Sequence, residues 1–202
     1  MGWFGGRTKD ADTTTATATG TLPAVPGYVA GTWTIDPVHS EISFTVRHMA
    51  VSKVRGRLGT VSGALVTSDD PAASSVTAEV DVTTITTFNE MRDGHIKSGD
   101  FFEVDKHPTA SFRSTSLTHD GDDFLVAGEL TLKGTTRPVT LTVEVSGIGP
   151  GAEGETRIGF SARTTINRRD FGIEFDARLD NGSLVVSDKV DLELEVEAVL
   201  NA

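Results

Sequence analysis

The chain has 202 residues, of which 37% are hydrophobic and 23% are charged, and this composition suits one globular domain with a tail. Its formal net charge of −11 argues against binding to nucleic acid or to anionic membranes, because both require a basic surface. The absence of cysteine excludes a disulfide scaffold and any cysteine-based zinc site.

Residues 1–30 have the composition of a tail or linker. They are rich in threonine and alanine from Thr8 onward and then carry Pro23, Pro26 and Gly27. Such a segment cannot bury enough apolar area to offset its ordering entropy, so we expect a disordered tail over 1–30 and one folded domain over 31–202. The start also lacks the apolar run of a signal peptide or a membrane span, which predicts a cytoplasmic location and no integral membrane segment.

The folded part mostly alternates apolar and polar residues, which is typical of strands with one apolar face. The glycines at positions 56 and 59 indicate a bulge or sharp bend between the first two of these segments. No segment offers the crossover helices that parallel strands need, so about eight strands joined by short turns predict an antiparallel meander. Both a sandwich and a closed up-and-down barrel fit this pattern; the interior of the barrel would be filled by side chains or would hold one small ligand.

One short helix is predicted near residues 87–99. Thr87 and Glu90 match a capping box, and Gly99 suits the position after the last turn. Phe88, Met91 and His95 would share one face of this helix, since they are spaced at i, i+3 and i+7. A lone helix with an apolar face in a strand-rich chain is expected to cover one end of the sheet.

The sequence lacks the patterns of a catalytic or metal site. None of the five histidines belongs to an HxxxH or HExxH pair, and no nucleophile elbow, phosphate loop or dinucleotide fingerprint occurs. The acidic residues around the predicted helix have structural explanations, such as an ion pair between Asp93 and Lys97. We therefore expect no catalytic residue, no metal and no cofactor.

The arginines and phenylalanines leave two interpretations open. Arg92 and Arg169 could form ordinary ion pairs with Asp170 and Asp93, or they could hold an anionic or polar head group. The phenylalanines along the strands and near the helix could pack a core or line a cavity, since both arrangements use inward apolar alternation.

The motifs resemble, in order, those of the YceI-like family over residues 31–199. The matching blocks are WTIDPVHS at 33–40, VRHM at 46–49, VSKVRG at 51–56, TFN at 87–89, RDGHI at 92–96, SGDFF at 98–102, GELTLKGTT at 128–136 and NRRDFG at 167–172. The resemblance implies an all-β fold, an eight-stranded antiparallel lipocalin-like barrel with one short helix near an end. It also implies a long apolar tunnel that holds a polyprenyl phosphate or an isoprenoid quinone. Family members are often periplasmic, whereas the start of this chain shows no signal peptide.

We expect from this resemblance a non-enzymatic carrier or store of an isoprenoid lipid or quinone. Two alternatives are a stress-response scavenger of lipophilic compounds and an enzyme that acts on an isoprenoid head group through His48, His95 and Arg92. An edge strand or the helix could also form a homodimer contact.

The residues expected to bind the lipid fall into an apolar and a polar set. The first set would line the tunnel or its mouth: Phe44, Val46, Val54, Phe88, Met91, Phe101, Phe102, Phe112, Phe160 and Phe171. The second set would contact the head group: His48, Asn89, Arg92, His95 and Arg169.

Overall fold

The structure, a computed structural model, describes residues 24–49, 51–180, 182 and 184–202. Most of the predicted tail, residues 1–23, lies outside these ranges. The strands of the described part are β1 (Gly31–Ile35), β2 (Glu41–His48), β3 (Ser52–Arg57), β4 (Thr60–Thr67), β5 (Ser75–Asp81), β6 (Thr109–Asp120), β7 (Asp123–Leu132), β8 (Thr135–Pro150), β9 (Thr156–Asn167) and β10 (Val186–Leu200). The helices described are α1 (Glu90–Lys97) and three short 3₁₀ turns, η1 (Pro71–Ala73), η2 (Val82–Thr84) and η3 (Arg168–Phe171).

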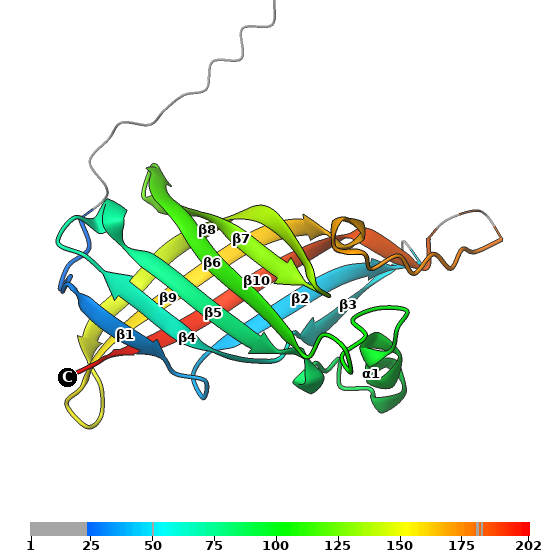
Figure 1. The fold of residues 1–202 in the computed structure, drawn as a ribbon, viewed down its shortest axis with the longest axis horizontal. Coiled ribbons are helices and arrows are strands. Elements are labelled where there is room, and N and C mark those ends of the chain that lie inside the picture. Colours follow the sequence, from blue (N-terminus) through cyan, green and yellow to red (C-terminus); the bar gives the residue numbers. More distant parts are fainter. Residues whose placement is uncertain (1–23, 50, 181, 183) are drawn as a thin grey trace, which may run out of the picture.

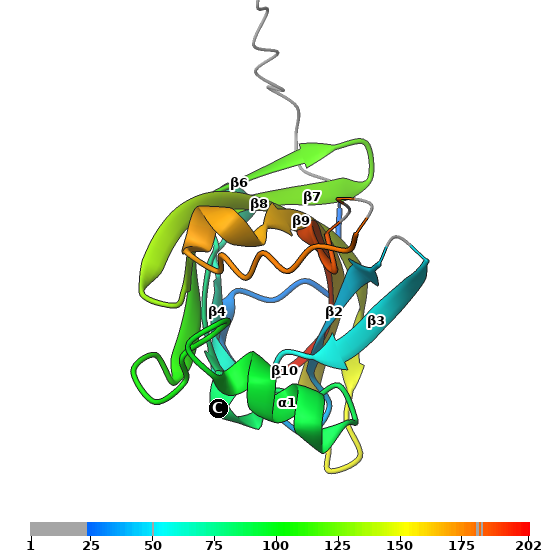
Figure 2. The ribbon, with the colours of Figure 1, turned by 90° about the vertical axis from the view of Figure 1, so that its right-hand side faces the viewer.

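The sheet closes into a barrel because β1 pairs with β4 on one edge and with β10 on the other. β2 continues along the same edge of β10, and β3 pairs with β2 as β4 pairs with β1. The pairs β1–β2 and β3–β4 are therefore two bent strands, and the described segments form eight antiparallel strands in a closed meander (Figures 1 and 2). The predicted fold class is confirmed.

The bends lie where the glycines indicated them. β3 ends at Arg57 and β4 begins at Thr60, and between them Gly59 has a φ of 152°. A Cβ on Gly59 would lie 2.2 Å from the Asp81 carbonyl oxygen, and one on Gly56 would lie 2.6 Å from the Thr86 carbonyl oxygen. Only glycine allows the wall of the barrel to approach the 81–86 segment this closely.

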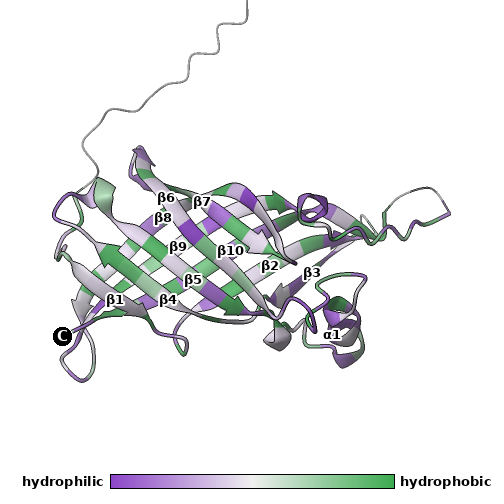
Figure 3. Ribbon diagram, in the orientation of Figure 1, coloured by the Kyte–Doolittle hydropathy of each residue, from purple (hydrophilic) through white to green (hydrophobic). Residues whose placement is uncertain are grey.

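Alternation along each strand separates an apolar interior from a polar exterior, as Figure 3 shows in green and purple. On β10, Leu192 and Ala198 are buried while Glu193 and Glu195 are exposed. Trp33 is fully buried near the end that holds the C-terminus, and its Nε1 donates a 2.8 Å hydrogen bond to Thr67 Oγ1. That bond satisfies the buried indole N–H, which would otherwise be costly.

The connection between β5 and β6 crosses the other end of the barrel and carries α1 (Figure 2). The predicted capping box is wrong, because Asn89 is the N-cap and its side chain accepts a hydrogen bond from the Arg92 N–H. The helix ends at Lys97 with Ser98 as its C-cap, so Gly99 follows the last turn as predicted, although it does not adopt a left-handed φ. Phe88 lies outside the helix with a φ of 60°, so the chain turns sharply before the first helical residue.

Asp93 organises the turn into α1. Its carboxylate accepts hydrogen bonds from Thr86 Oγ1 at 2.7 Å, from the Thr87 N–H at 2.7 Å and from Thr87 Oγ1. The Arg92 guanidinium then donates to Thr87 Oγ1 at 2.7 Å and to the Thr87 carbonyl at 2.9 Å. Burial raises the pKa of Asp93, but the hydrogen bonds from Thr87 and Thr86 outweigh it, and the pKa lies below its usual range. The expected pair with Lys97 is replaced by this network.

The apolar face predicted for the helix is not buried. Phe88 and Met91 are 75% and 89% exposed, and none of the eight residues of α1 is buried. Ile96 alone of the α1 side chains packs against the described core. None of the helices in the described ranges has the length and apolar character needed to cross a membrane.

We predict that Gly59→Ala destabilises the fold by about 2–4 kcal/mol, because the added methyl group meets the Asp81 carbonyl and the backbone leaves the range that alanine adopts. Gly99→Ala is the matched control, since a Cβ there has no neighbour within 4 Å among the described atoms. Urea unfolding measures both variants, and equal midpoints would contradict the assigned close approach.

We predict that Asp93→Ala costs about 1–3 kcal/mol at neutral pH, because three hydrogen bonds lose their acceptor. The folded-state pKa is depressed, so the stabilisation is complete above the unfolded-state pKa and is lost as the pH falls through the folded-state value. The difference in unfolding free energy between wild type and variant should therefore shrink in acid. Asp105→Ala, which removes an exposed carboxylate, should change little at any pH. If the difference in unfolding free energy stayed constant down to pH 2, the stabilising role of the Asp93 hydrogen bonds would be contradicted.

Candidate functional site

Three cavities lie end to end in the barrel. The α1-end cavity has a volume of about 410 Å³, the middle cavity about 170 Å³ and the Tyr28-end cavity about 350 Å³. The middle cavity shares lining residues with both neighbours: Leu58, Leu130 and Leu192 with the first, and Leu65, Val76, Val126, Val143 and Phe160 with the last. Together they form one apolar tunnel, and the two larger volumes are each within the range of small-molecule sites.

Three inward positions of the middle strands carry short side chains, in a lumen that is otherwise lined mostly by larger apolar residues. Ala78, Ala110 and Ala162 line the middle cavity from β5, β6 and β9. Side chains of this size cannot meet across the lumen of an eight-stranded barrel, which longer side chains can fill. Ser111 and Thr164 are the polar members of the described lining of this cavity, so its wall is almost wholly apolar.

The α1-end cavity reaches the surface beside the helix, because the exposed residues Asn89, Met91 and Arg92 also line it. We call this opening, bounded by α1 and the β2–β3 hairpin, the α1 mouth. Its polar lining comes from His48, Asn89, Arg92, His95 and Arg168. Polar groups at one mouth of an apolar tunnel suit an amphiphilic ligand.

Arg168 is the most deeply buried cation of the site. Its guanidinium donates to the Ile173 carbonyl at 2.6 Å, to the Ser187 carbonyl at 3.1 Å and to Asp188 Oδ1 at 2.7 Å. Burial lowers its pKa, while the charge of Asp188 acts in the opposite direction. This network ties the start of β10 to the turn after β9 and leaves the arginine fully engaged by the protein.

A cluster of three aromatic rings lies at the α1 mouth. The His95 ring lies edge-on to Phe101 and to Phe175, with 5.2 Å between centroids in each case, and the two phenylalanine rings are 4.9 Å apart. His95 Nε2 also lies 2.7 Å from Asp100 Oδ2. Since Phe175 belongs to the segment between β9 and β10, these rings join that segment to the loop that carries α1.

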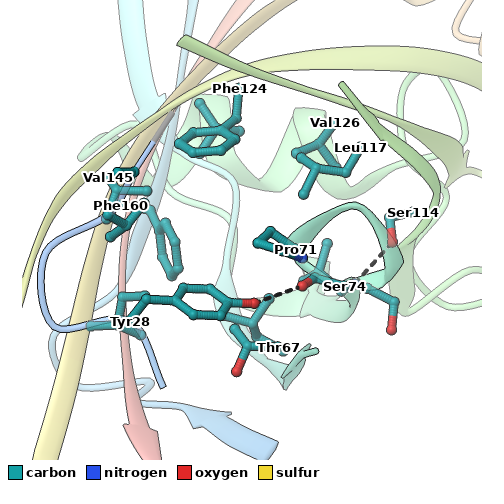
Figure 4. A pocket seen from close by; sticks show the side chains of 17 residues that line it. Tyr28, Thr67, Pro71, Ser74, Ser114, Leu117, Phe124, Val126, Val145 and Phe160 are labelled. Carbon is teal, nitrogen blue, oxygen red and sulfur yellow. Dashed lines mark hydrogen bonds between the residues drawn. The ribbon is translucent and has the colours of Figure 1, made fainter. Parts of the chain in front are cut away.

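The opposite end of the tunnel has hydroxyl groups and no charged group among its described lining residues. Tyr28 Oη donates to the Ser68 carbonyl at 2.6 Å and lies 3.2 Å from Ser74 Oγ (Figure 4). Figure 4 also shows Phe160 beside the Tyr28 ring, with Phe124 further along the wall. An uncharged, largely apolar wall of this kind accommodates a neutral end of a ligand.

The structure brings most of the predicted binding residues together. Ten of them line the α1-end cavity: Phe44, Val46, His48, Val54, Asn89, Met91, Arg92, His95, Phe101 and Phe102. Phe112 and Phe160 line the middle cavity.

Three predicted residues lie off the lining. Phe171 is 2% exposed and packs in the core, and Phe88 points to solvent outside the cavity. Arg169 turns away and pairs with Asp188 at 2.7 Å and with Asp176 at 3.2 Å. Phe171 and Arg169 lie off the lining because both belong to η3, whose tight turn ends the two-residue alternation of β9 at Asn167.

Arg168, Phe175 and Tyr28 line the tunnel although they are not among the predicted residues. A signal for Arg168 was available, because it continues the inward series of β9 by one step beyond Ile166. No comparable pattern marks Tyr28, which precedes the first strand, or Phe175, which lies in an irregular segment.

A cluster of Asp36, His39 and Glu197 lies near the start of β2, with ligand atoms close enough together to resemble a metal site. The Arg157 guanidinium, however, occupies its centre, at 2.9 Å from Asp36 Oδ2 and in contact with Glu197. Hydrogen bonds from His39 and Arg157 hold the pKa of Asp36 far below its usual range. The group is an ion-pair cluster that fastens β1, β9 and β10.

Comparison with known proteins agrees with this architecture. The model of the YceI-like domain matches residues 33–198. Protein YceI of Escherichia coli is 36% identical over 162 residues, which cover 80% of this chain and 82% of that protein.

Two solved structures share the fold. The crystal structure of BcnA from Burkholderia cenocepacia superimposes with a TM-score of 0.68 at 22% identity, covering 81% of this chain and 98% of that one. A domain from Saccharophagus degradans, described as polyisoprenoid binding and implicated in plant cell wall breakdown, gives a TM-score of 0.64 at 17% identity, with 86% and 100% covered. With a family match across the whole barrel, the chain belongs to the YceI-like domain family.

Proposed function

We propose that the protein binds one long isoprenoid lipid, such as a polyprenyl phosphate or an isoprenoid quinone, as a carrier or store. The observation that carries this proposal is the joining of three apolar cavities into one elongated tunnel. Burial of apolar surface at about 25 cal/mol per Å² supplies the affinity. The polyisoprenoid-binding description of the Saccharophagus degradans domain, which has the same fold, supports the chemical class.

The ligand head group belongs at the α1 mouth in this proposal. Arg92, Asn89 and His48 line that end, whereas the described lining of the Tyr28 end contains no charged side chain. The isoprenoid chain would then run through the middle cavity toward Tyr28. An uncharged tail end matches the apolar wall there, and a charged head placed there would lose its hydration without compensation.

Binding without chemistry is the activity that the polar groups favour. The Arg168 guanidinium is held by carbonyls and Asp188, Arg92 is held by Thr87, and His95 lies against Asp100. Two of these groups are arginines, which do not act as general acids or bases because they stay protonated, so the mouth favours positioning of a head group. We therefore propose a non-enzymatic protein without a cofactor.

Mass spectrometry of organic extracts from the purified protein tests the proposal directly. One isoprenoid lipid per chain is the expected result, either as purified or after incubation with a quinone and a polyprenol. Recovery of no lipid under both conditions would refute it. Equal affinity for unrelated lipophilic compounds would favour the scavenger alternative, and a chemically altered isoprenoid would favour the enzyme.

Ala162→Phe should separate long ligands from short ones. The larger ring fills the middle cavity, so a chain long enough to thread the whole tunnel should bind at least about tenfold more weakly, while one short enough for the α1-end cavity should bind as before. Thr165→Phe places the same ring on the exposed face of β9 as a control. Equal loss of long and short ligands in Ala162→Phe, with the fold intact by circular dichroism, would contradict a threaded chain.

A further inference from the structure

Exposed apolar side chains gather beside the α1 mouth. Of the seven large apolar side chains exposed in the described part, four lie there: Met49 and Val51 at the tip of the β2–β3 hairpin, and Phe88 and Met91 at the start of α1. The Val51 side chain is 88% exposed, about as much as that of Met91. We call these four residues the apolar tips. Such a concentration on protruding elements indicates a contact surface, since scattered single residues would need no explanation.

The hairpin that carries two of the tips is also basic. Between Ile42 and Ser68 the chain contains Arg47, Lys53, Arg55 and Arg57 and no carboxylate, although the whole chain has a net charge of −11. Arg47 lies opposite Lys53 in the register of β2 and β3. All four are exposed, because the inward positions of the hairpin belong to the tunnel lining. We call them the basic strip.

The charges of the basic strip are mostly available to a partner. Arg57 pairs with Glu41 at 2.7 Å, whereas Arg47, Lys53 and Arg55 make no ion pair with any described residue. Figure 2 shows this hairpin leaving the wall of the barrel at the end where α1 lies. Three of the four charges of the strip are therefore available to a partner, while Arg57 is engaged by Glu41.

Phe88 is held in its exposed position at a conformational cost. A bulky residue at a φ of 60° is a genuine outlier, and here the Phe88 N–H donates to Thr86 Oγ1 at 3.0 Å while Arg57 lies 5.7 Å from the ring centroid. Strain that presents an aromatic ring to solvent is typical of functional sites. The Asp93 network described above is what keeps the turn in this shape.

We propose that this end of the protein docks on the surface of an anionic phospholipid bilayer. The apolar tips enter the interfacial region, and the basic strip lies over the negatively charged head groups. The α1 mouth then opens onto the bilayer surface, from which a lipid can enter the tunnel without crossing water; this last step rests on the proposed function. An anionic bilayer is the partner that offers both an apolar layer and a dense negative charge at the required depth.

The docking is one-sided. The segment 172–180 crosses the same end on the side opposite α1 and runs toward the β2–β3 hairpin in Figure 2, and it carries Glu174, Asp176 and Asp180. Asp176 is paired with Arg169 and Arg178, but the other two carboxylates form no ion pair with a described residue. This segment reaches further out than α1 and the hairpin in Figure 1, so repulsion from the head groups would turn it away from the bilayer and tilt the barrel axis toward the side of α1 and the hairpin.

Flotation of the full-length chain with vesicles tests the docking. Wild type should float with vesicles of phosphatidylglycerol and phosphatidylcholine in equal parts, and binding should fall with phosphatidylcholine alone or at high salt, where screening is strong. Val51→Asp should reduce binding about tenfold, because a charge replaces an apolar tip. Val29→Asp is the control, since Val29 is exposed and lies next to Thr67 at the Tyr28 end of the barrel, away from the mouth. Equal flotation of the two variants would overturn the proposal.

The basic strip has its own test. Arg55→Gln should weaken binding to the anionic vesicles about fivefold, and Arg113→Gln, which removes an exposed arginine from β6, should leave it unchanged. Equal binding of wild type to anionic and to neutral vesicles would overturn the charge assignment.

Binding of a short-chain quinone from aqueous solution distinguishes docking from lipid binding. Val51→Asp and Arg55→Gln should bind this probe like wild type, because neither Val51 nor Arg55 lines the tunnel. Failure of wild type to float while it binds the quinone would refute the docking and leave the proposed function standing. Flotation of wild type without quinone binding would support the docking and contradict the proposed function.

Discussion

The backbone pairing of β1 with both β4 and β10 is the constraint on which the rest of the molecule depends. It closes the sheet, so no strand on that side keeps a free edge and every second side chain of every strand must point into one lumen. Trp33 lies in the middle of this seam, opposite Leu200 on β10 and Leu65 on β4, and is fully buried. Closure fixes the diameter, and the inward side chains of the described strands leave a space that the protein itself does not fill.

The two ends of the tunnel differ because they are built from different parts of the chain. At the α1 mouth, the long connections between β5 and β6 and between β9 and β10 contribute polar side chains that a strand wall would have to bury. Two carboxylates hold these side chains in place. Asp93 accepts a hydrogen bond from the Thr87 N–H, and Arg92 donates to the Thr87 hydroxyl. Asp188 forms ion pairs with both Arg168 and Arg169. At the Tyr28 end the hydrogen bonds of the hydroxyls are made largely within the protein, so nothing there calls for a charged ligand.

Much of the fold could be predicted because apolar and polar residues alternate along every strand that has one face in the barrel interior and one face in solvent. β10 is the clearest case, with Leu192, Leu194 and Ala198 inside and acidic residues between them. The same logic placed Phe44, Val46 and Phe112 on the lining correctly. A family resemblance was still needed to choose a barrel over a sandwich, because alternation does not encode closure.

The failures have local physical causes. The start of α1 was misplaced because Thr87 and Glu90 imitate a capping box, while the actual turn depends on the positive φ of Phe88 and on Asp93, six residues after Thr87 in sequence. Phe171 and Arg169 lie off the lining because a 3₁₀ turn begins directly after β9 and rotates the side chains that follow Arg168. Neither effect has a periodic signal, since each depends on contacts that form only in the folded chain.

The net charge of the chain is an average that the fold separates into regions of opposite sign. β10 carries Asp191, Glu193 and Glu195 on its outer face, and the next strand, β2, places Thr45, Ser43 and Glu41 opposite them. Thr45 and Ser43 thus separate the acidic face of β10 from Arg55 and Arg57 on β3, because β2 pairs with both strands. Since charges in physiological salt act over about 8 Å, an approaching anionic surface would be repelled by the acidic face of β10 and attracted by the hairpin independently. A chain with a net charge of −11 can thus meet such a surface, but only by the end at which its tunnel opens.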